Sequence, residues 1–126
     1  MDVTVQSSGS EPVVKNPNEV KAGEKIIDVG PKTISFLREK IEMAKLIIWN
    51  GPLGIYEEGA VKQTEELAIL IAESAGISIA GGGDTSASIE RLELEDAFDF
   101  FSTGGGAMLE FLVKETLPGI ESLKSA

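Results

Sequence analysis

The chain has 126 residues, enough for one domain with a hydrophobic core but too few for two ordinary domains. Its 11 basic and 21 acidic side chains give a formal net charge of −10, and the lack of cysteine and histidine excludes disulfides, thiolate metal sites and imidazole chemistry. Because this charge repels a nucleic-acid backbone, and no apolar run could cross a bilayer or serve as a secretory signal, we expect a cytoplasmic protein with no nucleic-acid or membrane partner.

Apolar runs alternate with helical patterns along the chain, which predicts an α/β fold. A polar stretch at residues 7–25 predicts a surface loop, followed by a short strand at 26–29. We expect helices at residues 31–44, 61–75 and 85–91, and buried strands at 46–49, 77–80 and 98–101. A last helix begins near residue 107, before Pro118-Gly119 interrupts and a short tail follows. The helical crossovers make the three buried strands parallel.

Glycines follow each of the three buried strands, as Gly51 and Gly54, residues 81–83 and residues 104–106. In open parallel sheets, ligands bind beyond the carboxyl ends of the strands, where free N–H groups of helix N-termini attract anions. Any one of these clusters is explained as well by a tight turn with close packing. Three clusters at the same edge predict a polyphosphate site.

Asp84 and Thr85, which follow the second glycine cluster, each allow two interpretations. An acidic residue beside an anion site is favourable when a cation lies between them, and Mg²⁺ prefers carboxylate and phosphate oxygens. Alternatively, Asp84 caps a helix that begins at Thr85. Thr85 either donates its hydroxyl to a phosphate or simply occupies the first helical turn, and the residues alone leave both questions open.

Four motifs together resemble the phosphoglycerate kinase family, in the order and spacing Asp28-Val29-Gly30-Pro31-Lys32-Thr33, Trp49-Asn50-Gly51-Pro52-Leu53-Gly54-Ile55-Tyr56-Glu57, Ile79-Ala80-Gly81-Gly82-Gly83-Asp84-Thr85 and Ser102-Thr103-Gly104-Gly105-Gly106-Ala107. The similarity runs from about residue 2 to the C-terminus. It implies a single domain over residues 1–126, the C-terminal portion of the family's nucleotide-binding domain. The implied fold is α/β, a partial doubly wound (Rossmann-like) parallel sheet of about four strands flanked by helices.

The resemblance also implies a function, because this family transfers a phosphoryl group between ATP and 3-phosphoglycerate in glycolysis, with Mg²⁺ on the nucleotide. It assigns the metal to Asp84 and the ribose hydroxyls to Glu57, and it places Pro52 and Ile55 beside the adenine. The remaining residues implied at the phosphates and the transferred group are Asn50, Gly82, Gly83, Thr85, Gly104, Gly105 and Gly106.

The chain departs from the family pattern in two ways. Tyr56 stands where phenylalanine is usual, and residues 59–63 replace a bulkier, glycine-containing connection. Family members are also longer, with an arginine-rich phosphoglycerate domain and phosphate-binding lysines that nothing in this sequence matches. We therefore expect a fragment that binds ATP or ADP, meets 3-phosphoglycerate only through the missing domain and is inactive alone. The alternative is a non-catalytic, self-folding or self-associating module that binds nucleotide or phosphate weakly.

The implied strand order separates Val3-Thr4-Val5 from the strand at 46–49 by two strands that are absent here. Either residues 3–5 move across to pair beside residues 46–49, or two chains pair at that exposed sheet edge. The sequence favours the homodimer, because a three-residue strand covers little of the edge.

Overall fold

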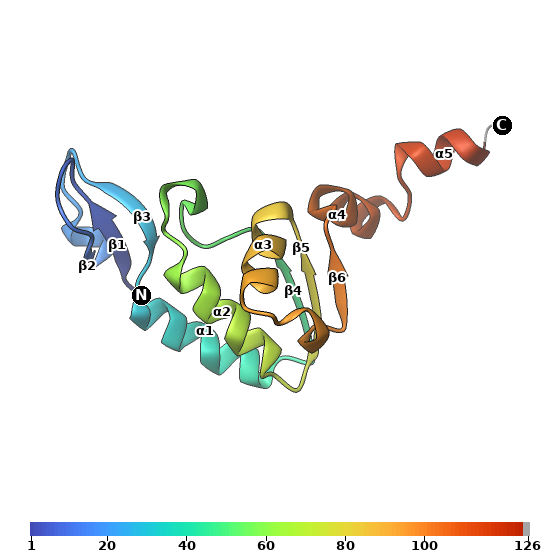
Figure 1. Cartoon of the computed structure of the whole chain (residues 1–126), viewed down its shortest axis with the longest axis horizontal. Coiled ribbons are helices and arrows are strands. Elements are labelled where there is room, and N and C mark those ends of the chain that lie inside the picture. The colour runs from blue at the N-terminus through green and yellow to red at the C-terminus, as the bar shows by residue number, and fades with distance from the viewer. Residues whose placement is uncertain (125–126) are drawn as a thin grey trace.

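The structure, a computed structural model, describes residues 1–124, and its strands form two three-stranded sheets. The antiparallel sheet has the order β2-β1-β3, and its strands are β1 (Val3–Gln6), β2 (Val13–Lys15) and β3 (Lys25–Val29). The parallel sheet has the order β4-β5-β6, and its strands are β4 (Leu46–Asn50), β5 (Ile77–Gly81) and β6 (Phe100–Ser102). Figure 1 shows the antiparallel sheet at one end of the molecule and the C-terminal helix at the other, with the parallel sheet between them.

The α/β class and the three parallel strands are confirmed. In β4 and β5, Leu46 lies opposite Ile77, and in β5 and β6, Ile79 lies opposite Phe100. The strand predicted at 98–101 begins two residues later, because Phe98 follows the short 3-10 helix η3 (Glu95–Ala97) and turns into the core beside Trp49, with ring centroids 6.4 Å apart. Burial of these two rings fixes the entry to β6.

The parallel sheet has three strands rather than about four, because the N-terminal strand pairs elsewhere. In β1, Val3 lies opposite Val29 of β3 and Val5 lies opposite Val13 of β2, both in antiparallel register. The prediction that residues 3–5 could pair beside residues 46–49 is therefore wrong. The prediction of a loop over residues 7–25 also fails in part, because this stretch contains β2 and the 3-10 helix η1 (Pro17–Glu19).

Three helices cover one face of the parallel sheet (Figure 1): α1 (Pro31–Met43), α2 (Lys62–Ala72) and α3 (Gly83–Arg91). One buried cluster joins them to the sheet, with Ile34 of α1, Leu67 of α2 and Ile89 of α3 packed around Trp49 and Ala80. Strand residues of opposite parity point to the other face, where the exposed hydrophobic side chains include Leu46, Ile48, Ile77 and Phe100.

The C-terminal part is more helical than the sequence predicts. Helix α4 (Gly105–Lys114) begins two residues before the expected start, and α5 (Pro118–Lys124) occupies the stretch expected to be a tail. Proline has no backbone N–H and its φ angle suits the first helical turn, so Pro118 begins a helix here instead of ending the structure. Among residues 1–124, no helix is both long and apolar enough to span a bilayer.

Candidate functional site

The carboxyl ends of the three parallel strands meet at one edge of the sheet, as the glycine clusters predict. Asn50 at the end of β4 lies opposite Gly81 of β5, and Gly81 lies opposite Ser102 of β6. Helices α3 and α4 both begin at this edge, with Gly82 and Gly104 as their N-cap residues. We refer to four residues that lie close together at this edge as the turn cluster: Asn50 at the end of β4, Gly82, Thr85 of α3 and Gly105 of α4.

The turn cluster is tightly packed around Gly82 and Gly105. A Cβ atom on Gly105 would lie 2.6 Å from Gly82 Cα and would also overlap Gly82 N and the Asn50 side-chain oxygen. Gly82 itself has a backbone φ of 106°, which residues other than glycine rarely adopt. Its N–H donates to the Ser102 carbonyl at 3.2 Å. Close packing therefore accounts for Gly105, and backbone conformation accounts for Gly82.

Neither explanation applies to Gly83 and Gly106. A Cβ atom on either residue would meet nothing within 4 Å, and neither residue has a positive φ. Both are exposed in the first turns of α3 and α4, where glycine is a poor helix former. Their missing side chains leave open space in front of the two helix N-termini.

Each helix presents unpaired N–H groups to this space. The first backbone hydrogen bond of α3 runs from Ser86 N–H to the Gly82 carbonyl at 2.8 Å, and that of α4 runs from Met108 N–H to the Gly104 carbonyl at 2.9 Å. The amides before these donors have no intrahelical acceptor, and neither N-cap residue supplies a side-chain acceptor. The two helix dipoles add partial positive charge, so the edge is suited to an anion.

Asp84 lies in the first turn of α3 and is partly exposed. The interpretation that it caps a helix beginning at Thr85 is wrong, because the helix begins at Gly83 and Gly82 is its N-cap residue. The described residues include no group of three or more acidic side chains that could hold a metal ion. A cation at Asp84 would therefore need further oxygen ligands from phosphate or water, which is how Mg²⁺ is commonly bound.

Thr85 is completely buried, and its hydroxyl accepts a hydrogen bond from Gly51 N–H at 2.9 Å. This bond ties the turn after β4 to the start of α3, a role that the sequence does not reveal. Asn50 is exposed, and its side-chain oxygen lies beside Gly82 and Gly105. The direct phosphate contacts expected of Thr85 and Asn50 stay predictions.

The residues expected around the base and ribose follow directly after β4, on a segment that leads away from the turn cluster. Pro52, Ile55 and Glu57 belong to the connection between β4 and α2, which leaves the sheet edge and approaches β3 (Figure 1). The Ile55 N–H donates to the Ile27 carbonyl of β3 at 2.8 Å, and Glu57 is exposed in the 3-10 helix η2 (Tyr56–Glu58). Their contacts with a nucleotide also stay predictions.

The importance of two buried carboxylates, Asp2 and Asp28, was not predicted from the sequence. Asp2 accepts hydrogen bonds from the N–H groups of Thr33 at 2.8 Å and Lys32 at 3.2 Å, so it caps α1 from a distant part of the chain. Burial raises the pKa of Asp2, but these hydrogen bonds outweigh burial and hold it below its ordinary value. Asp28 interrupts the apolar run of β3, and burial raises its pKa above the ordinary value.

The chain matches known proteins over almost its whole length. A family model described as phosphoglycerate kinase matches residues 1–115. A phosphoglycerate kinase of Francisella philomiragia is 44% identical over 128 residues, covering 98% of this chain and 33% of that protein. One from Francisella tularensis subsp. tularensis is 41% identical over 119 residues, covering 94% of this chain and 30% of that protein. The chain thus spans about a third of the length of these curated relatives.

Solved structures give the same result. The structure of phosphoglycerate kinase from Coxiella burnetii has a TM-score of 0.82 and 41% identity, covering 95% of this chain and 32% of that chain. The enzyme of the same name from Pyrococcus horikoshii has a TM-score of 0.77 and 34% identity, covering 98% of this chain and 31% of that chain.

Proposed function

Because the chain belongs to the phosphoglycerate kinase family, we propose that its sheet edge binds the phosphates of a magnesium nucleotide for phosphoryl transfer between ATP and 3-phosphoglycerate. The observation that carries this proposal is the open space at Gly83 and Gly106, in front of two uncapped helix N-termini. Packing explains neither glycine, whereas an anion that approaches the backbone amides explains both.

In this proposal, backbone N–H groups make most of the contacts with the phosphates. The first amides of α3 hold the nucleotide phosphates, and residues 104–106 at the start of α4 face the transferred group. Phosphoryl transfer depends chiefly on positioning and on neutralising charge over the moving oxygens, which fixed N–H donors supply without reorganisation. The Gly51–Thr85 hydrogen bond and the contact between Gly82 and Gly105 keep the two helix starts in one arrangement.

Magnesium fits the residues present at this edge. Asp84 is a partly exposed carboxylate in the first turn of α3, close in sequence to the amides that would hold the phosphates. Bound there, the ion would supply positive charge to the phosphate oxygens. Glu57 would accept hydrogen bonds from the ribose hydroxyls, and Pro52 and Ile55 would pack beside the adenine.

Turnover also needs a site for the second substrate. We propose that 3-phosphoglycerate is bound by the N-terminal domain that the resemblance implies, so that the chain alone does not catalyse the reaction. Holding both reactants in place can account for roughly 7–11 kcal/mol of barrier lowering. A coupled assay of the chain alone, and of the chain mixed with the remaining part of a relative, measures this directly.

The binding site is tested by titrating MgADP into the chain and following backbone amides by NMR. We expect a dissociation constant on the order of millimolar, about −4 kcal/mol, with the shifts centred on residues 82–85 and 104–107. Asp84→Asn should remove the magnesium dependence, whereas Asp96→Asn, the same charge change at an exposed position in η3, should leave it intact. Micromolar MgADP binding by the wild type, or nucleotide binding by the wild type that does not depend on magnesium, contradicts the assignment.

The uncovered sheet face supports a second function, self-association. Exposed apolar side chains occur on all three strands, at Leu46, Ile48, Ile77 and Phe100, and Leu46 lies opposite Ile77. Among the strands that the structure describes, β4 pairs with β5 alone and is therefore an edge strand. Exposed strand edges of this kind commonly pair with another chain. We propose a homodimer at the β4 edge, and sedimentation over a range of concentrations that finds only monomer would exclude it.

A further inference from the structure

Both sequence neighbours of Glu57, in the connection between β4 and α2, are tied to other parts of the fold. Tyr56 lies against Arg91, the last residue of α3, whose guanidinium carbon is 5.7 Å from the centroid of the Tyr56 ring. Glu58 forms an ion pair with Lys25 of β3, with 2.6 Å between Lys25 Nζ and Glu58 Oε1. The backbone of Glu57 is therefore held from both sides, while its side chain is exposed.

Arg91 is itself held in place by α2. Its guanidinium forms an ion pair with Glu65 of that helix, and the Glu65 side chain is only 27% exposed. Partial burial reduces the screening of such a pair by water and salt. The C-terminal end of α3 also favours a cation, because the helix dipole places partial negative charge there. Arg91 thus bridges the Glu65 carboxylate and the face of the Tyr56 ring.

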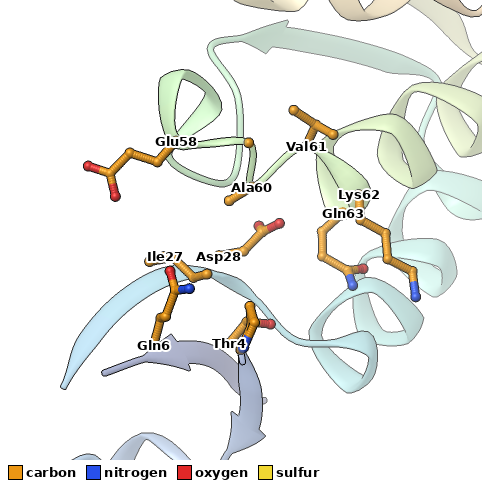
Figure 2. A pocket seen from close by; sticks show the side chains of 11 residues that line it. Thr4, Gln6, Ile27, Asp28, Glu58, Ala60, Val61, Lys62 and Gln63 are labelled. Carbon is orange, nitrogen blue, oxygen red and sulfur yellow. The ribbon is translucent and has the colours of Figure 1, made fainter. Parts of the chain in front are cut away.

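The side of the connection that faces β3 is held mainly by backbone contacts. The Ile55 N–H donates to the Ile27 carbonyl at 2.8 Å, and a Cβ atom on Gly54 would lie 2.7 Å from the carboxyl carbon of Asp28. Figure 2 shows Asp28 pointing from β3 into the cavity of about 300 Å³ that the connection borders. Loss of the Arg91 contact would therefore leave the connection attached to β3.

Helix α3 links the connection to the proposed phosphate site. It begins at Gly83, where its first N–H groups face the phosphates in the function proposed above, and it ends at Arg91. A helix of nine residues holds its two ends at a fixed separation, because each residue advances the helix by a constant rise. The contact between Arg91 and Tyr56 therefore sets the position of Glu57 relative to the phosphate-binding amides.

We propose that Arg91 is a positioning residue for the nucleotide: by holding the Tyr56 ring, it places the Glu57 carboxylate to accept hydrogen bonds from the ribose hydroxyls. This proposal rests on the function proposed above and adds to it a residue that lies outside the four sequence motifs. Arg91 itself does not contact the nucleotide in this arrangement. Its effect is on specificity, as a preference for ribonucleotides over nucleotides without ribose hydroxyls.

The test compares three ligands by NMR titration of the full chain with magnesium present: ADP, 2′,3′-dideoxy-ADP and inorganic pyrophosphate. We expect the wild type to bind ADP about tenfold more tightly than 2′,3′-dideoxy-ADP, because the hydroxyls donate to a charged group. Arg91→Ala should reduce this preference to about threefold, because an exposed cation–π contact corresponds to a factor of about two to five. Pyrophosphate binding should not change. An unchanged preference for ADP, or an equal loss of ADP and pyrophosphate binding, would overturn the proposal.

Further variants separate the position of Arg91 from its charge. Tyr56→Phe retains the ring and should keep the preference for ADP, whereas Tyr56→Ala should lower it as Arg91→Ala does. Glu65→Gln removes the ion pair that holds Arg91 and should also lower the preference, so it carries the test even if Arg91→Ala does not fold. Arg38→Ala, at an exposed position of α1, is the control for lost charge and should bind all three ligands as the wild type does. A reduced preference in Arg38→Ala would refute the positioning role.

The three ligands also distinguish this proposal from the function on which it rests. If the wild type binds none of them, both are wrong. If it binds pyrophosphate, and binds ADP and 2′,3′-dideoxy-ADP equally, the phosphate site stands and the role of Arg91 is refuted.

Discussion

Replacing Gly105 with alanine tests whether the turn cluster is held together by backbone contact. The added methyl group would overlap the backbone of Gly82 and the side-chain oxygen of Asn50. The backbone atoms cannot move aside without shifting the end of β5, so the start of α4 must separate from the sheet. Gly106→Ala is the matched control, because the same change one residue later meets nothing within 4 Å.

The two substitutions should change stability in opposite directions. Overpacking a tightly packed site costs typically about 1–3 kcal/mol, and we expect Gly105→Ala to lose this much of its unfolding free energy. Alanine is a better helix former than glycine by about 1 kcal/mol in a helix interior, so Gly106→Ala should be neutral or slightly stabilising. The predicted difference between the variants is therefore about 2 kcal/mol, most of it from contact with Gly82.

Urea unfolding followed by the fluorescence of Trp49, which is buried at 6% exposure, measures both changes. Gly105→Ala should lower the midpoint without changing the slope, and it should also weaken MgADP binding because it displaces the first amides of α4. Equal stability of the two variants would refute the packing argument. If Gly105→Ala is destabilised but binds MgADP as the wild type does, the turn cluster does not form part of the phosphate site.

Substitutions at three further residues test individual side chains by urea unfolding. Thr85→Val should cost about 1–3 kcal/mol, because the half-buried Gly51 N–H loses its acceptor, whereas Thr85→Ser should restore most of the stability. Asp2→Asn should destabilise the fold at neutral pH, and the difference from the wild type should shrink as the pH falls below the ordinary aspartate pKa of about 3.9, because the pKa of Asp2 is lowered in the folded state. Asp28→Asn should do the opposite: burial raises the Asp28 pKa, so ionisation costs the wild type stability as the pH rises through that pKa, and the variant should lack this loss. A wild-type pH profile that neither aspartate variant alters would contradict both assignments.

Local pattern determined much of the architecture. The apolar runs at 46–49 and 77–80 correctly predict β4 and β5, and the helical spacing of Ile34 and Ile41 predicts the buried face of α1. These features follow from the sequence because the spacing of apolar residues along the chain determines which face of an element is buried. The prediction that the glycine clusters share one sheet edge is also confirmed, since parallel strands place all their carboxyl ends on one side. The family followed from the same motifs.

Long-range contacts decided the rest. The pairing of Val3–Gln6 with β3 depends on which strand edges are available in space, and its short sequence carries no signal for that choice. Likewise, Gly105 and Gly106 look alike in the sequence, but only the first touches another turn. The burial of Asp28 and of the unpaired Gln63 oxygen arises where β3 meets the start of α2. Only the tertiary structure decides it, because solvent exposure and hydrogen-bond partners are properties of the packed chain.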